Sequence, residues 1–139
     1  MRRLVPVAAL LLAGCASLGP TPSETPGVET RGDLVRAFSE RGWRAVPVRF
    51  VRPVGVVGEG TVYRVEGRTV VVYDYASPEQ AAAAAPADVV RLVRLDAGRG
   101  VQAYRRPALV VLTYGRLRTA FDLRLADLLA GPSVARAER

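Results

Sequence analysis

Hydrophobic and polar residues follow a strand-like pattern in two parts of the chain, and each part predicts a β-hairpin. The strands are residues 61–65 and 68–75 in the first hairpin and residues 101–105 and 108–114 in the second. Residues 66–67 (Glu-Gly) predict the first turn, and residues 106–107 (Arg-Pro) predict the second. Residues 70–72 and 109–112 are apolar on both faces of an extended chain. We therefore expect them to lie in central strands that are covered on both sides.

Three segments have the 3.6-residue period of amphipathic helices and begin at residues that cap helices. Thr30 with Asp33, and Thr119 with Asp122, have the spacing of a capping box, in which each side chain bonds to the backbone N–H of the other residue. Ser77 precedes a proline at the first helical position. These signals place the helix starts after residues 30, 77 and 119.

Glycine and proline residues predict where these helices end. Gly42 ends the first helix, and Gly131 with Pro132 ends the third. Pro86 is expected to kink or interrupt the second helix, which restarts there and reaches residue 95. The restarted part is predicted to bury one apolar side, made of Val89, Val90, Leu92 and Val93.

Residues 43–52, between the first helix and the first hairpin, alternate as a strand does. Pro47 and Pro53 have no N–H to donate to a ladder, which favours an edge strand. The element order is helix, strand, hairpin, helix, hairpin, helix. This order predicts an α+β fold, a small antiparallel sheet built from hairpins with about three helices packed on it. We expect the domain to cover residues 33–132 and residues 133–139 to form a frayed tail.

The first 14 residues have the pattern of a secretory signal peptide. Arg2 and Arg3 give a positive start, and residues 4–12 are almost continuously apolar. This apolar run is about half the roughly 20 residues that a membrane-spanning helix needs. We therefore expect a cleaved signal rather than a transmembrane anchor.

The end of this signal is more specific than a general cleavage site. Leu12, Ala13, Gly14 and Cys15 resemble the bacterial lipobox, Leu-[Ala/Ser]-[Gly/Ala]-Cys, at all four positions. The resemblance implies cleavage between Gly14 and Cys15, a diacylglyceryl thioether on Cys15, and acylation of its new amine, as with palmitate. Two or three acyl chains anchor a protein durably, whereas one holds it only marginally. A plain signal peptide with an unrelated cysteine is the alternative.

The rest of the chain is similar to small, uncharacterised bacterial envelope lipoproteins. The matching pieces are residues 70–75 followed by 77–85, and residues 109–115 followed by the helix up to Gly131. This resemblance implies no activity. It implies an exported protein that is lipid-anchored in the cell membrane or the outer membrane, on the non-cytoplasmic face.

Residues 15–32 predict a lipidated cysteine followed by a flexible tether. Proline, glycine, serine and threonine are frequent after Cys15, and hydrophobic periodicity is lacking. Such a coil would span roughly 20–25 Å. A loop packed on the domain is the alternative.

The composition excludes several kinds of chemistry. All 20 basic residues are arginine, and the chain has no histidine. There is consequently no Ser-His pair, no imidazole metal ligand, no Schiff-base lysine and no P-loop lysine. The single cysteine allows neither an internal disulfide nor a thiolate zinc cluster. We therefore predict no cofactor, no metal and no enzymatic activity.

One candidate binding site lies at the turn of the second hairpin. Arg105 and Arg106, beside Tyr104, combine positive charge with an aromatic ring. This combination can neutralise an anionic ligand and stack on it. A solvated hairpin turn is the alternative interpretation.

The leading interpretation is a non-enzymatic, lipid-anchored envelope protein that binds or supports another envelope component. Removal of the signal leaves 18 arginines against 13 acidic residues, a net charge of about +5. The first alternative is therefore a basic binding module for an anionic glycan, a lipid head group or DNA, although nucleic acid is an unusual partner outside the cell. The second alternative is a hydrolase that uses two carboxylates among Glu59, Glu66 and Asp74 as acid and base.

Replacement of Cys15 by serine tests the anchor. We expect Cys15→Ser to move the protein from the membrane fraction to the soluble fraction, because no acyl chain can then be attached. Fractionation of cells, followed by immunoblotting, measures this change. A variant that stayed quantitatively in the membrane fraction would contradict lipid anchoring.

Overall fold

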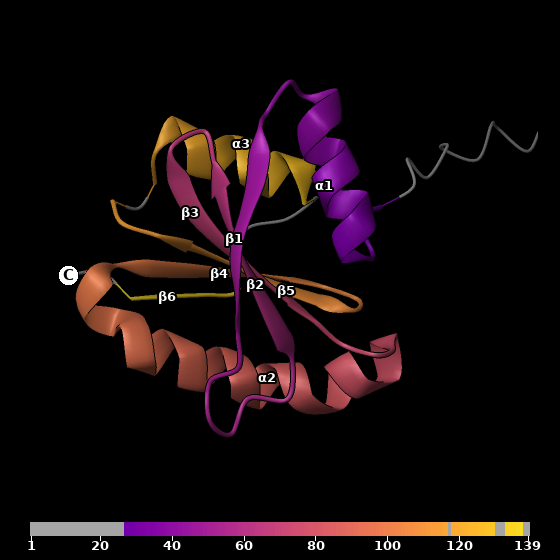
Figure 1. Ribbon diagram of the computed structural model, residues 1–139. Helices are drawn as coiled ribbons and strands as arrows, with labels where there is room; N and C mark the ends of the chain where they lie inside the picture. The colour runs from indigo at the N-terminus through magenta and orange to yellow at the C-terminus, as the bar shows by residue number, and fades with distance from the viewer. Residues whose placement is uncertain (1–26, 117, 130–132, 138–139) are drawn as a thin grey trace, which may run out of the picture.

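The fold was analysed in a computed structural model that describes residues 27–116, 118–129 and 133–137. In this part of the chain, six strands form one antiparallel sheet, with helix α2 on one face and helices α1 and α3 on the other (Figure 1). The helices are α1 (Arg31–Glu40), α2 (Pro78–Asp96), the 3₁₀ turn η1 (Ala97–Arg99) and α3 (Ala120–Leu128). The strands are β1 (Ala45–Val51), β2 (Glu59–Val65), β3 (Arg68–Asp74), β4 (Val101–Arg106), β5 (Leu109–Tyr114) and β6 (Ala135–Ala137). The predicted α+β fold is confirmed.

The two predicted hairpins form the centre of the sheet, whose strand order is β1-β2-β3-β5-β4-β6. Glu66 and Gly67 both have positive φ, 48° and 74°, as a two-residue type I′ turn requires. The predicted central strands β3 and β5 are neighbours and pair antiparallel, with Val72 opposite Val111. The turn of the second hairpin lies at residues 107–108, one residue later than predicted.

Strand β1 is an edge strand of the described sheet, as its prolines predicted. The register shifts between Pro47 and Arg49, so Val48 is the extra residue of a β-bulge. This bulge lies beside the residue that cannot donate a hydrogen bond.

The predicted helix caps are confirmed. Both capping boxes are complete, at Thr30 with Asp33 and at Thr119 with Asp122. The Ser77 side chain accepts a hydrogen bond from the Gln80 backbone N–H.

The predicted interruption of the second helix at Pro86 is wrong, because α2 continues through this residue. Pro86 and Ala82, whose carbonyl loses its helical donor at Pro86, are both exposed. Water can therefore solvate that carbonyl, and the buried face opposite, from Ala81 to Leu92, holds the helix on the sheet. The predicted apolar side also needs correction, because Asp88 is buried and Val90 is half exposed.

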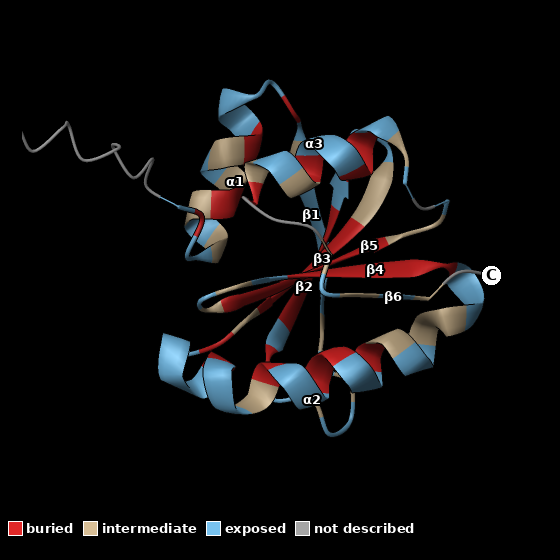
Figure 2. Ribbon diagram, turned by 180° about the vertical axis from the view of Figure 1, so that it is seen from behind, coloured by how far each residue is buried: buried red, intermediate tan, exposed pale blue. Residues whose placement is uncertain are grey.

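The sheet separates two hydrophobic cores (Figure 2). The core beneath α1 and α3 is organised by Trp43, whose ring lies 5.7 Å from that of Phe38 and 5.2 Å from that of Phe121. Opposite it, small side chains of α2 such as Ala81 and Ala85 pack on the strands. The alanine-rich start of α2 thus lets the helix approach the sheet closely.

Both ends of the domain lie beyond the predicted limits of residues 33 and 132. Val28, predicted as part of the tether, is buried in the core, and its carbonyl accepts a hydrogen bond from Arg106 Nε at 2.9 Å. The predicted frayed tail is also wrong at its centre, because Ala135–Ala137 pair with β4 as strand β6. The predicted helix stop at residues 131–132 falls outside the described residues.

The two prolines of α2 provide a matched test of this helix. We expect Pro86→Ala to raise the free energy of unfolding by about 1–3 kcal/mol, because it restores a helical hydrogen bond and removes a steric clash. Pro78→Ala should leave it nearly unchanged, since a proline at the first helical position costs nothing. Urea unfolding followed by circular dichroism measures both values. Equal effects of the two substitutions would contradict a continuous helix.

Candidate functional site

The predicted anionic-ligand site at Tyr104, Arg105 and Arg106 does not form. Alternation along β4 separates Arg105 from its two neighbours. Tyr104 is buried, accepts a hydrogen bond from Gln102 Nε2 at 2.6 Å, and donates one to the Asp122 carbonyl at 3.3 Å. Arg106 donates to the carbonyls of Val28 and Leu129 and so joins the two ends of the domain. Both side chains are structural, and Arg105 alone is exposed.

Two of the three candidate carboxylates lie in one place. Glu59 and Asp74 are opposite each other on β2 and β3 and line a cavity of about 290 Å³. Glu66 lies at the other end of this hairpin, where it accepts a hydrogen bond from the Arg44 backbone N–H at 3.0 Å.

Each carboxylate of this cavity faces a guanidinium group. Asp74 contacts Arg31 at 3.2 Å, and Glu59 forms an ion pair with Arg52. Burial raises the pKa of the Asp74 carboxyl, Arg31 opposes this shift, and Glu59 adds to it. The cavity therefore has the two carboxylates of an acid-base pair, but each is compensated by an arginine.

Cys15 and Gly14, the predicted lipidation and cleavage residues, lie outside the described residues. Among the described helices, none has the length and apolar character to cross a bilayer. The described residues also contain no cluster of three or more acidic or cysteine side chains that would hold a metal ion.

A groove of about 560 Å³ lies on the face of the sheet that α2 covers. Helix α2 packs on β4, β5 and β6, so the surface of β1, β2 and β3 beside its C-terminal end stays open. We call this cavity the α2 groove. Its lining residues are Arg49, Val51, Pro53, Val62, Thr69, Val71, Tyr73, Asp96, Arg99, Tyr114 and Gly115.

The α2 groove combines an apolar lining with two positive charges. Val62 and Val71 are almost fully buried beneath it. Arg49 and Arg99 line it and make no ion pair with any described residue, whereas Asp96 accepts a hydrogen bond from the Tyr114 hydroxyl at 2.8 Å. The groove therefore contains two guanidinium groups and only one carboxylate, and that carboxylate already accepts a hydrogen bond from Tyr114. This arrangement suits an anionic group attached to an apolar body.

A buried carboxylate fixes the loop at the edge of this groove. Asp88 Oδ2 accepts hydrogen bonds from the Tyr75 hydroxyl at 2.7 Å and from the backbone N–H groups of Val57 and Gly58 at 3.0 and 3.1 Å. Residues 52–58, which include the lining residue Pro53, are thereby attached to α2. The loop that contains Pro53 is consequently held to α2 at residues 57 and 58 by a buried acid whose hydrogen bonds are satisfied.

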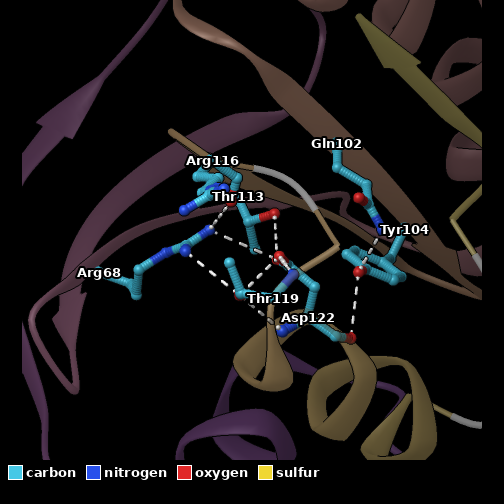
Figure 3. A network of polar contacts seen from close by, with 7 residues as sticks. All are labelled: Arg68, Gln102, Tyr104, Thr113, Arg116, Thr119 and Asp122. Carbon is cyan, nitrogen blue, oxygen red and sulfur yellow. Dashed lines mark hydrogen bonds and ion pairs between the residues drawn. The ribbon is translucent and has the colours of Figure 1, made fainter. Parts of the chain in front are cut away.

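A second polar network connects the other face of the sheet to α3 (Figure 3). The Asp122 carboxylate accepts hydrogen bonds from Thr113 Oγ1 at 3.2 Å and from the Thr119 N–H at 2.9 Å, and Arg68 approaches it at 3.5 Å. Arg68 also donates to the Arg116 carbonyl at 3.0 Å. These contacts occupy Asp122 as a helix cap, so its role is structural.

Sequence reasoning missed the α2 groove because its residues come from five separate stretches of the chain. Tyr73 and Tyr114 lie within the predicted strands 68–75 and 108–114, but no local pattern places Arg49 and Arg99 beside them. One signal was available in the sequence: Gly115 directly follows β5 and lines the groove. Comparisons with protein-family models, curated proteins and solved structures found no match for this chain.

The tyrosines predict how stability depends on alkaline pH. All five have a raised pKa, with burial as the first cause, and Tyr73 and Tyr104 reach about 12. The unfolded chain loses its phenolic protons near pH 10, before the folded protein does. Stability should therefore be constant up to about pH 10 and fall as the pH rises towards 12.

Urea unfolding across this pH range, with phenolate absorbance as a second signal, checks the expectation. Lysine and histidine are absent, so the tyrosines dominate the titration in this range. Tyr73→Phe should make the decline shallower. A free energy of unfolding that did not change up to pH 12 would contradict the burial of these phenols.

Proposed function

We propose that this chain is a lipid-anchored envelope protein whose domain binds an anionic, partly apolar envelope component in the α2 groove. The lipobox ending at Cys15 supports the anchor and the export. The single observation that carries the binding role is the pair Arg49 and Arg99, which face an apolar groove without ion-pair partners among the described residues.

Charge and shape explain why this groove suits such a ligand. A volume of about 560 Å³ is within the usual size of small-molecule sites. Valine side chains can bury the apolar part of a ligand, and Thr69 and Tyr73 can donate hydrogen bonds from their hydroxyl groups. A guanidinium group recognises a carboxylate or phosphate with two parallel hydrogen bonds.

Binding is better supported than catalysis. The buried carboxylates Asp88 and Asp122 already accept several hydrogen bonds each from the protein's own groups. The hydrolase alternative retains Glu59 and Asp74 in one cavity, but each of these carboxylates contacts an arginine of the protein, Arg52 and Arg31 respectively.

Removal of either groove arginine should weaken the binding of an anionic amphiphile. With decyl phosphate as the probe, below the concentration at which it forms micelles, we expect Arg49→Gln and Arg99→Gln to raise the Kd by about fivefold each. Added salt should weaken binding to the unmodified protein and have less effect on the two variants. Isothermal titration calorimetry measures the Kd at each salt concentration.

Arg136→Gln is the matched control, because Arg136 is an exposed arginine of β6 that does not line the α2 groove. Its Kd should equal that of the unmodified protein. Decanol, which has the same chain without the charge, should bind all variants alike. Equal affinity of all three variants for decyl phosphate would overturn the proposed site.

A further inference from the structure

The most exposed large apolar side chains of β1 and the loop that follows it are three in number. They are Val48, Phe50 and Val54, with exposed fractions of 59%, 80% and 94%. Val48 and Phe50 belong to β1, and Val54 lies in the loop that follows it (Figure 1). We call these residues the β1 patch. Burial inside the domain does not account for side chains as exposed as Phe50 and Val54, and exposed apolar residues close together in the chain indicate a contact surface.

The segment that carries the β1 patch is rich in arginine. Arg49 and Arg52 lie between its apolar residues along the chain, and Arg44 precedes them. Among them only Arg52 forms an ion pair within the described residues, with Glu59. Arginine next to exposed aromatic and aliphatic side chains is the composition that binds anionic lipid surfaces.

The β1 patch also lies near the point where the chain enters the domain. Arg31, at the start of α1, donates a hydrogen bond to Thr61 Oγ1 at 2.7 Å. Thr61 is the cross-strand partner of Phe50. The 11 residues between Cys15 and residue 27 would span roughly 20 Å as a flexible coil. A lipid on Cys15 would therefore hold the patch within reach of the bilayer surface.

We propose that the β1 patch inserts into the interface of an anionic bilayer and so orients the anchored domain on the membrane. This inference rests on the proposed function for the anchor, but the patch itself acts without the lipid. Phe50 and Val54 bury their side chains at the level of the head groups, where the net positive charge of the domain attracts anionic lipid.

Pairing of two copies through β1 is less favourable. Pro47 has no N–H to donate, and the bulge at Val48 bends the free edge of the strand. Both features oppose the addition of a regular strand.

Vesicle binding of the unlipidated chain from residue 16 onward tests the proposal, since this form keeps every described residue. We expect it to co-sediment with vesicles of phosphatidylglycerol and phosphatidylcholine, and less with phosphatidylcholine alone. Phe50→Ser and Val54→Ser should lower the bound fraction, with a loss of apparent affinity of about tenfold for the two together. Leu123→Ser on α3 is the matched control, because Leu123 is exposed to a similar extent, 68%.

A fluorescent reporter locates the contact directly. Phe50→Trp should give a blue-shifted emission on vesicles and be quenched by lipids with brominated acyl chains, whereas Leu123→Trp should give neither change. Circular dichroism establishes that each variant is folded. Equal binding of all variants, or an unchanged Phe50→Trp emission, would overturn the proposal. So would a Phe50-dependent dimer in sedimentation without vesicles.

The vesicle-binding experiment tests the β1 patch separately from the lipid anchor and from the α2 groove. Loss of membrane attachment in Cys15→Ser cells tests the lipid, and decyl phosphate affinity tests the arginines of the groove. A failure confined to the vesicle experiment would remove the β1 patch alone.

Discussion

The fold depends on the need to cover both faces of the central pair of strands, β3 and β5. Val70 and Val72 face one side of the sheet, and Val71 and Tyr73 face the other. An apolar strand exposed on either side would lose the free energy gained by removing that surface from water. Helices must therefore lie on both faces, and the sequence supplies α2 for one face and α1 with α3 for the other. The chain order of hairpin, helix, hairpin, helix meets this constraint without long loops.

Features determined by neighbouring residues were predictable from the sequence. The capping boxes at Thr30 and Thr119, and the turn at residues 66–67, depend on spacing within four residues. The central position of β3 followed from its continuous apolar run. Sequence reasoning failed at Pro86 because the solvent exposure of one carbonyl and the packing of the opposite helix face decided the result.

Contacts between distant residues explain the other differences. Helical periodicity places Val90 inside and Asp88 outside, but the hydroxyl of Tyr75 and two backbone N–H groups from residues 57–58 supply the donors that a buried carboxylate needs. Arg106 likewise looks like a turn residue until the carbonyls of Val28 and Leu129 come beside it. The α2 groove combines segments that are up to about 65 residues apart in the chain.

Because α2 covers only part of its face of the sheet, a surface that can bind a ligand stays open beside this helix. One helix of 19 residues cannot cover six twisted strands, and α2 lies over the half that contains β4, β5 and β6. The uncovered half holds β1, whose proline and bulge keep its edge from pairing with further strands. Successive residues of this strand serve two different surfaces, because Arg49 faces the α2 groove and Phe50 faces the opposite side. If Phe50 enters the membrane interface, Arg49 and the groove are held close to the lipid head groups. A groove with two arginines and an apolar lining is then placed where anionic amphiphiles are most concentrated.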